Sequence, residues 1–147
     1  MTYNVHKVIP ISDINPAKNT PVVSRVFMIL TVLIFVLIQP KNQIELINFF
    51  YQYSAIPCEL VNFSPLSESQ FYNNNCFYDQ FKVIFPTKNL FFSVIFANFF
   101  HANFIHILGN LWSFWIFGNN VEDKLGKIKY LFFLLFIGIT SIFSHTF

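Results

Sequence analysis

The stretch HANFIHILGN, residues 101–110, runs directly into the apolar segment LWSFWIF, residues 111–117. It places polar side chains at the point where a helix enters a bilayer, and hydrocarbon offers no hydrogen bond in place of the lost water. His106 and Asn110 are four residues apart, so they lie on one face of a helix. Because both side chains can donate a hydrogen bond into the same small space, this face is a candidate functional site.

The composition is that of a membrane protein. Of the 147 residues, 54% are hydrophobic and only 11% are charged, which does not suit a soluble domain. The net charge of +2 is too small to indicate a nucleic-acid partner. The length corresponds to roughly one domain. Residues 1–20 are polar and show no cleavable signal pattern.

Three segments are long and apolar enough to cross a bilayer. They are residues 22–39, 103–120 and 130–147. We therefore expect an all-α membrane protein with three transmembrane helices. Residues 1–21 are then a cytoplasmic N-terminal segment, and residues 22–147 a transmembrane domain.

The basic residues predict how these helices are oriented. They are dense before the first span and in the short link between the second and third spans, and sparse between the first two. These three groups are Lys7, Lys18 and Arg25; Lys124, Lys127 and Lys129; and Lys41, Lys82 and Lys88. Because basic residues flank the cytoplasmic ends of spans, we expect a cytoplasmic N-terminus and an outer loop over residues 40–98. The expected location is the inner (plasma) membrane of a bacterium.

The outer loop is expected to be structured. Asn42 and Glu45 resemble a capping box that begins a helix, and Pro57 is predicted to close that helix. Residues 67–75 are polar and predict a surface excursion. Residues 90–100 are apolar again, which predicts an interfacial or re-entrant approach to the second span.

Cys58 and Cys76 both lie in this outer loop. A disulfide between them is possible in an oxidising compartment. The alternative is two free cysteines that pack as small apolar side chains. The sequence leaves both states open.

The motifs around the second span resemble those of rhomboid intramembrane serine proteases. The pattern His-x4-His-x3-Asn within residues 101–110 is followed by WIFGNNVEDKLG, residues 115–126, which looks like the family's link after this span. Three further pieces are similar to the family: IPISDINP, TPVV and YSAIP, at residues 9–16, 20–23 and 53–57. The chain thus resembles the first half of such a protease.

The resemblance implies a core of six membrane helices with a serine in a Gly-x-Ser-Gly motif on the fourth and a histidine on the sixth. It also implies that the substrate is another protein's transmembrane segment, cut near the membrane surface. His106 and Asn110 match the side chains that form the family's oxyanion hole, and His101 matches the first histidine, at the mouth of the site. Losing one such donor typically costs about 3 kcal/mol of transition-state stabilisation.

The sequence departs from the family pattern in its catalytic residues. Residues 138–141, GITS, are not Gly-x-Ser-Gly and lie one helix too early. Neither the nucleophile nor the general base is present, so we expect a rhomboid-like bundle truncated before its catalytic serine helix and inactive alone. It would be a truncated product, an interrupted reading frame or half of a split enzyme. The expected partners are a transmembrane protein substrate, the lipid bilayer and a complementing C-terminal half; no cofactor is implied.

The candidate residues also have plainer interpretations. His106 and Asn110 could form a structural interhelical hydrogen bond. A metal site made of His101, His106 and His145 is disfavoured, because the first two are five residues apart and no cysteine or carboxylate joins them. A local dyad of Ser141 and His145 is disfavoured against small-residue helix packing.

A rival function comes from another class of protein. The polar face of the second span would hold a client transmembrane helix or a partner subunit, without catalysis. Glu122 and Asp123 are expected in a solvated link, where either carboxylate can bond to a neighbouring helix end.

Overall fold

A computed structural model describes residues 17–73, 75–76 and 82–146, without the side chains of residues 145 and 146. The motif at residues 9–16, Lys7 and the His145 side chain lie outside this part. The described residues are all-helical apart from one isolated bridge between Ser67 and Val83, which agrees with the expected all-α class. The chain divides into two compact units, Met1–Val32 with His101–Phe132, and Leu33–Phe100 with Phe133–Phe147.

The first unit is built around a long helix that carries the candidate site. Helix α6 (Phe104–Ser113), the π-helix η3 (Phe114–Gly118) and α7 (Asn119–Leu125) follow one another without a break. Asn103 begins this helix because its side chain accepts the backbone N–H of His106 at 2.9 Å. Gly126, with φ of +78°, ends it. The helix is thus five residues longer at its C-terminal end than the predicted limit of residue 120.

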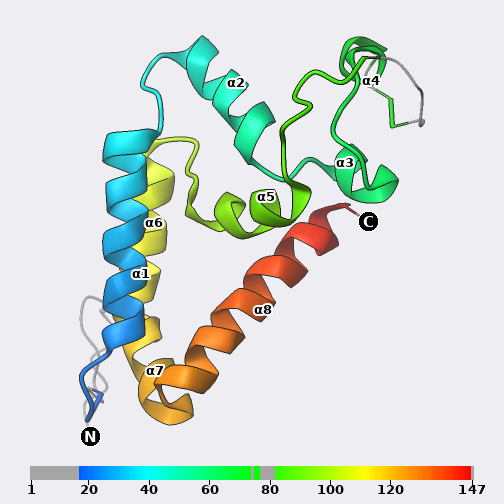
Figure 1. The fold of residues 1–147 in the computed structure, drawn as a ribbon. Coiled ribbons are helices and arrows are strands. Elements are labelled where there is room, and N and C mark those ends of the chain that lie inside the picture. The colour runs from blue at the N-terminus through cyan, green and yellow to red at the C-terminus, as the bar shows by residue number, and fades with distance from the viewer. Residues whose placement is uncertain (1–16, 74, 77–81, 147) are drawn as a thin grey trace, which may run out of the picture. The chain divides into compact units, whose positions relative to one another are not determined.

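Helix α1 (Val22–Leu33) lies beside α6 in the first unit (Figure 1). The rings of Phe27 and Phe114 stack between them, with centroids 4.9 Å apart and planes within 13°. The chain continues from α1 into the π-helix η1 (Ile34–Ile38), so the helical run ends one residue before the predicted limit. Helix α8 (Lys127–Thr146) begins in the first unit, three residues before the predicted start at residue 130.

The second unit holds four short helices between residues 43 and 96, which confirms that this loop is structured. They are α2 (Gln43–Tyr53), α3 (Pro57–Asn62), α4 (Glu68–Asn73) and α5 (Leu90–Phe96), and α5 continues into the 3₁₀-helix η2 (Ala97–Phe99). Asn42 caps α2 by accepting the N–H of Ile44, as its position predicts. The predicted role of Pro57 is wrong. Helix α2 already ends at Tyr53, and Pro57 starts α3 because proline is preorganised for the first helical turn.

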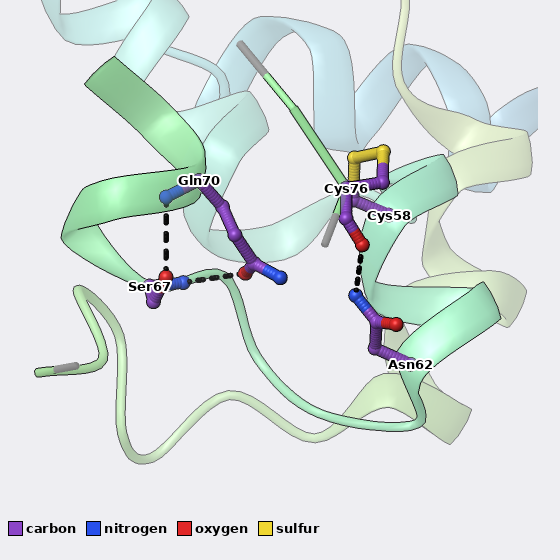
Figure 2. Close-up of a disulfide and its surroundings, with 5 residues drawn as sticks. All are labelled: Cys58, Asn62, Ser67, Gln70 and Cys76. Atoms are coloured by element: carbon purple, nitrogen blue, oxygen red, sulfur yellow. Dashed lines mark hydrogen bonds between the residues drawn. A yellow bond between two sulfur atoms is a disulfide. The ribbon is translucent and has the colours of Figure 1, made fainter. Parts of the chain in front are cut away.

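The predicted surface excursion at residues 67–75 is also wrong in part. Most of it forms α4, and Ser67 and Gln70 are buried. Their side chains cap each other's backbone, with Gln70 Oε1 accepting the N–H of Ser67 and Ser67 Oγ accepting that of Gln70 (Figure 2). Polar residues are buried here because these local bonds satisfy them.

Cys58 and Cys76 form a disulfide in the second unit, with Cα atoms 4.9 Å apart (Figure 2). The two cysteines are 18 positions apart in the sequence, and Asn62 Nδ2 donates a hydrogen bond to the Cys76 carbonyl. The structure therefore selects the oxidised state of the two that the sequence left open.

The lengths of the apolar helices bear on membrane insertion. Among the described residues, α8 alone contains a segment, Lys127–Ser144, that is long and apolar enough to cross a membrane. Leu90–Phe99 and Phe104–Leu125 meet the same criteria only when taken together, and Val22–Ile38 is apolar but shorter. The three-span arrangement therefore stays a prediction.

Candidate functional site

The N-terminal part of the long helix brings together the three residues singled out in the sequence. His101 lies just before the helix, whereas His106 and Asn110 lie on consecutive turns of α6. Asn110 Nδ2 is 2.8 Å from His101 Nε2. The rings of His101 and His106 meet edge to face with centroids 5.1 Å apart. His101 therefore contacts both of the residues that share the helix face.

The hydrogen bond fixes the roles of its two partners. In this contact the Asn110 amide nitrogen donates and His101 Nε2 accepts, since an amide nitrogen does not accept hydrogen bonds. The Asn110 amide then keeps a second N–H for another acceptor. His101 is only 4% exposed, while His106 and Asn110 are exposed. The buried imidazole thus orients the Asn110 amide, and two donor side chains face outward from the same helix face.

The other end of this helix is fixed by carboxylates. Glu122 is 3% exposed and accepts the backbone N–H groups of Val23 and Ser24, each at 2.9 Å. The Ser24 hydroxyl also donates to Glu122 at 2.9 Å and lies 3.2 Å from the hydroxyl of Tyr130. These backbone groups belong to the first turn of α1 and have no partner inside their own helix. A carboxylate at a helix N-terminus is further favoured by the helix dipole.

Asp123 extends this contact to the residues that precede α1. Its carboxylate accepts the backbone N–H groups of Lys18 and Asn19, at 3.2 and 3.0 Å, and the Asn19 side-chain amide at 2.6 Å. The expectation of a solvated link is therefore wrong for Glu122, which is buried. The expectation that either carboxylate bonds to a neighbouring helix end is confirmed for Glu122, whereas Asp123 bonds to the segment before α1. Sequence reasoning missed Ser24 and Tyr130; the only signal was two acidic residues directly after an apolar run.

Gly118 allows α1, η3 and α8 to approach closely within the first unit. A Cβ at Gly118 would lie 3.0 Å from the Tyr130 hydroxyl and 3.2 Å from the Ser24 hydroxyl. At Gly109, in contrast, a Cβ would meet nothing within 4 Å. The long helix is thus tightly packed at its acidic end and open near the candidate site.

The second unit contains a buried ion pair beside the disulfide. Glu59 Oε2 is 2.6 Å from Lys88 Nζ, and both side chains are at most 1% exposed. Glu59 Oε1 accepts the N–H of Leu66, and Lys88 also donates to the carbonyl of Tyr51. Burial raises the pKa of Glu59 and lowers the pKa of Lys88, although their mutual contact opposes both shifts. This cluster joins α2, α3 and the segment before α5.

Two exposed serines lie on helices α6 and α8. Ser141 is exposed on α8. Ser113 donates to the Gly109 carbonyl within its own helix. Within the described ranges, no three histidine, cysteine or acidic side chains converge as metal ligands would.

Comparison with known families places the candidate cluster in context. Residues 88–147 match the family model described as the Rhomboid domain, and this range contains His101, His106 and Asn110. No curated protein and no solved structure matches the chain. The resemblance seen in the sequence motifs is therefore confirmed over residues 88–147, which are similar to the Rhomboid domain.

Proposed function

We propose that this chain takes part in intramembrane serine proteolysis of the rhomboid type, in which transmembrane segments of other proteins are cut. When a serine attacks a peptide carbonyl, the oxygen becomes an anion. In this proposal His106 and Asn110 donate hydrogen bonds to that oxygen, and His101 orients Asn110. The observation that carries the proposal is the 2.8 Å contact between His101 and Asn110, inside the Rhomboid match. An oriented donor needs no reorganisation during the reaction.

The membrane arrangement is part of the same proposal. We infer an integral protein of the bacterial inner membrane, with residues 1–21 in the cytoplasm and three spans within residues 22–147. The helices Val22–Ile38, Phe104–Leu125 and Lys127–Thr146 and the distribution of lysine and arginine support it. Residues 40–98 then face the outside, which agrees with the Cys58–Cys76 disulfide, since disulfides persist in oxidising compartments.

The nucleophile and the general base come from outside residues 1–147 in this proposal. These residues contain no Gly-x-Ser-Gly motif, and oxyanion donors without an attacking group do not form an acyl-enzyme. The polypeptide of residues 1–147, taken by itself, is therefore expected not to cleave a substrate. A complementing polypeptide that contributes helices four to six of the family would complete the site.

A complementation assay tests the proposal. Residues 1–147 are co-expressed with helices four to six of a rhomboid protease, and cleavage of a reporter transmembrane segment is measured in membranes. We expect cleavage with both parts and none with either alone. Asn110→Ala should lower the rate about 100-fold, the usual cost of losing one oxyanion donor. Asn119→Ala is the matched control, because it removes the same side chain from the far end of the same helix.

Two results would contradict the proposal. One is cleavage by purified residues 1–147 alone, together with labelling by a fluorophosphonate probe. The other is a complemented enzyme whose rate is unchanged by both Asn110→Ala and His106→Ala.

A non-catalytic role in holding a client helix is the second candidate, favoured by one observation. Ile128, Phe132 and Phe136 recur every four residues along α8 and are 74%, 67% and 69% exposed, so they form an apolar strip on one face. Such a strip suits lipid or a partner helix. Co-purification of a transmembrane client without cleavage, in the presence of helices four to six, would favour this function over proteolysis.

A further inference from the structure

The second unit contains a small cavity lined mainly by aromatic side chains. Its volume is about 200 Å³, and it is formed by α2, α4 and the segment at residues 84–85. Four of its lining side chains are aromatic: Tyr51, Phe71, Tyr72 and Phe85. Glu68 also lines the cavity and gives it a formal negative charge.

The aromatic rings are arranged edge to face. Tyr51 and Phe71 have centroids 4.9 Å apart with planes at 75°, and Phe71 and Tyr72 have centroids 5.4 Å apart with planes at 83°. All three rings line the cavity, with Phe71 39% and Tyr72 80% exposed. The face of an aromatic ring carries negative charge and attracts a cation placed over it.

The walls of the cavity are held by bonds that do not involve the aromatic side chains. Glu68 N donates to the Lys82 carbonyl and Ile84 N donates to the Leu66 carbonyl, both at 2.9 Å. The mutual caps of Ser67 and Gln70 and the disulfide from α3 secure the same region (Figure 2). These bonds therefore fix the backbone that surrounds the cavity.

The charges around the cavity favour a positive ligand. Glu68 pairs with Lys82 at 3.4 Å, but the Lys82 side chain is 81% exposed, so this ion pair is weak and can be exchanged. The Lys88 ammonium, bonded to the Tyr51 carbonyl, is neutralised by Glu59 at 2.6 Å. No uncompensated cation of the described residues lines the cavity.

We propose that this cavity binds a methylated ammonium group, through cation–π contacts with Tyr51, Phe71 and Tyr72 and an ion pair with Glu68. Glu68 supplies the opposite charge for a cation, and the Tyr51 carbonyl already accepts from Lys88. A trimethylammonium group needs no acceptor and fits aromatic walls. Choline has this chemistry, either as a free cation or as the headgroup of a lipid.

Calorimetric titration of the purified chain in maltoside detergent with choline chloride tests this site. 3,3-Dimethylbutan-1-ol is the matched ligand control, because it has the shape of choline without the charge. We expect saturable binding of choline and much weaker binding of the neutral analogue. Tyr72→Leu should weaken choline binding about two- to fivefold, the range for one exposed cation–π contact. Glu68→Gln should weaken it by a similar factor.

Matched variants control for unrelated effects. Tyr53→Leu and Glu45→Gln change exposed side chains of α2 that do not line the cavity, and they should leave choline binding unchanged. Non-reducing electrophoresis of each variant verifies that Cys58 and Cys76 remain paired. Absence of saturable choline binding up to millimolar concentration would overturn the proposal. So would equal binding of the neutral analogue, or equal affinities for Tyr72→Leu, Glu68→Gln and the two controls.

Repeating the titration in nanodiscs identifies the source of the ligand. If phosphatidylcholine nanodiscs abolish the binding of added choline and phosphatidylglycerol nanodiscs preserve it, the cavity takes a lipid headgroup. If choline binds in both, the cavity takes the free cation. Each outcome supports the proposed ligand class, and neither depends on proteolysis.

Discussion

The two ends of the helix Phe104–Leu125 differ in how their polar side chains are satisfied. At the N-terminal end, His106 and Asn110 are exposed, and Asn110 is oriented by buried His101. At the C-terminal end, Glu122 is buried and accepts two backbone N–H groups and a hydroxyl. Bonds made within the fold stabilise it, whereas donors directed outward are available to a ligand. Substitutions at the two ends should therefore affect stability and activity separately.

The largest loss of stability is expected when buried Glu59 loses the lysine that neutralises its charge. Lys88→Met leaves Glu59 buried without its partner, which typically costs about 3–5 kcal/mol. The free energy of unfolding, measured by denaturant titration in mixed micelles, tests this. Lys82→Met is the control, since its exposed pair with Glu68 should contribute about 1 kcal/mol or less. Similar losses for the two variants would refute the claim that the buried ion pair stabilises the fold more than the exposed one.

The acidic end of the long helix should show the next largest effect. Glu122→Gln removes the charge from a group that accepts three hydrogen bonds, and we expect a loss of about 2 kcal/mol in unfolding free energy. Glu45→Gln, at an exposed position of α2, should be close to neutral. If Glu122→Gln is as stable as the parent chain, the carboxylate is not what holds α1 and α7 together.

Two glycines of the same helix give a matched pair. Gly118→Ala places a methyl group 3.0 Å from the Tyr130 hydroxyl, and overpacking of this kind costs about 1–3 kcal/mol. Gly109→Ala meets no atom within 4 Å and should stabilise the helix by up to about 1 kcal/mol. Thermal unfolding, followed by circular dichroism, should show a lower Tm for Gly118→Ala and a higher Tm for Gly109→Ala. Equal shifts of Tm would contradict the difference in packing between the two ends.

The smallest effect on stability is expected at the candidate site. His106→Ala changes an exposed side chain, so the unfolding free energy should fall by about 0.5 kcal/mol or less. A loss of 2 kcal/mol or more would instead indicate a structural interhelical hydrogen bond.

The sequence predicted the features that depend on near neighbours. Asn42 caps its helix as predicted, because a cap bonds to a backbone group two or three residues away. The bonds from Glu122 to Val23 and Ser24 were not foreseeable, because these residues lie 99 and 98 positions away along the chain and no local pattern reveals them. The predicted effect of Pro57 failed because the same residue can end one helix or begin another.

The candidate site was likewise predictable only in part. The four-residue spacing of His106 and Asn110 placed them on one face, and the motif suggested their family. The bond between His101 and Asn110 was not foreseeable, because His101 precedes the helix and its position depends on the chain's path before the cap. The aromatic cavity also joins residues as far apart as Asn48 and Phe85, and helical periodicity gives no sign of it.

The most direct test of the account measures kcat, KM and unfolding free energy for Asn110→Ala in the complemented protease. The account predicts a fall in kcat of about 100-fold, with KM nearly unchanged and stability lowered by about 1 kcal/mol or less. An unchanged kcat with a large loss of stability would contradict it, because Asn110 would then serve the packing of the bundle and not the chemistry.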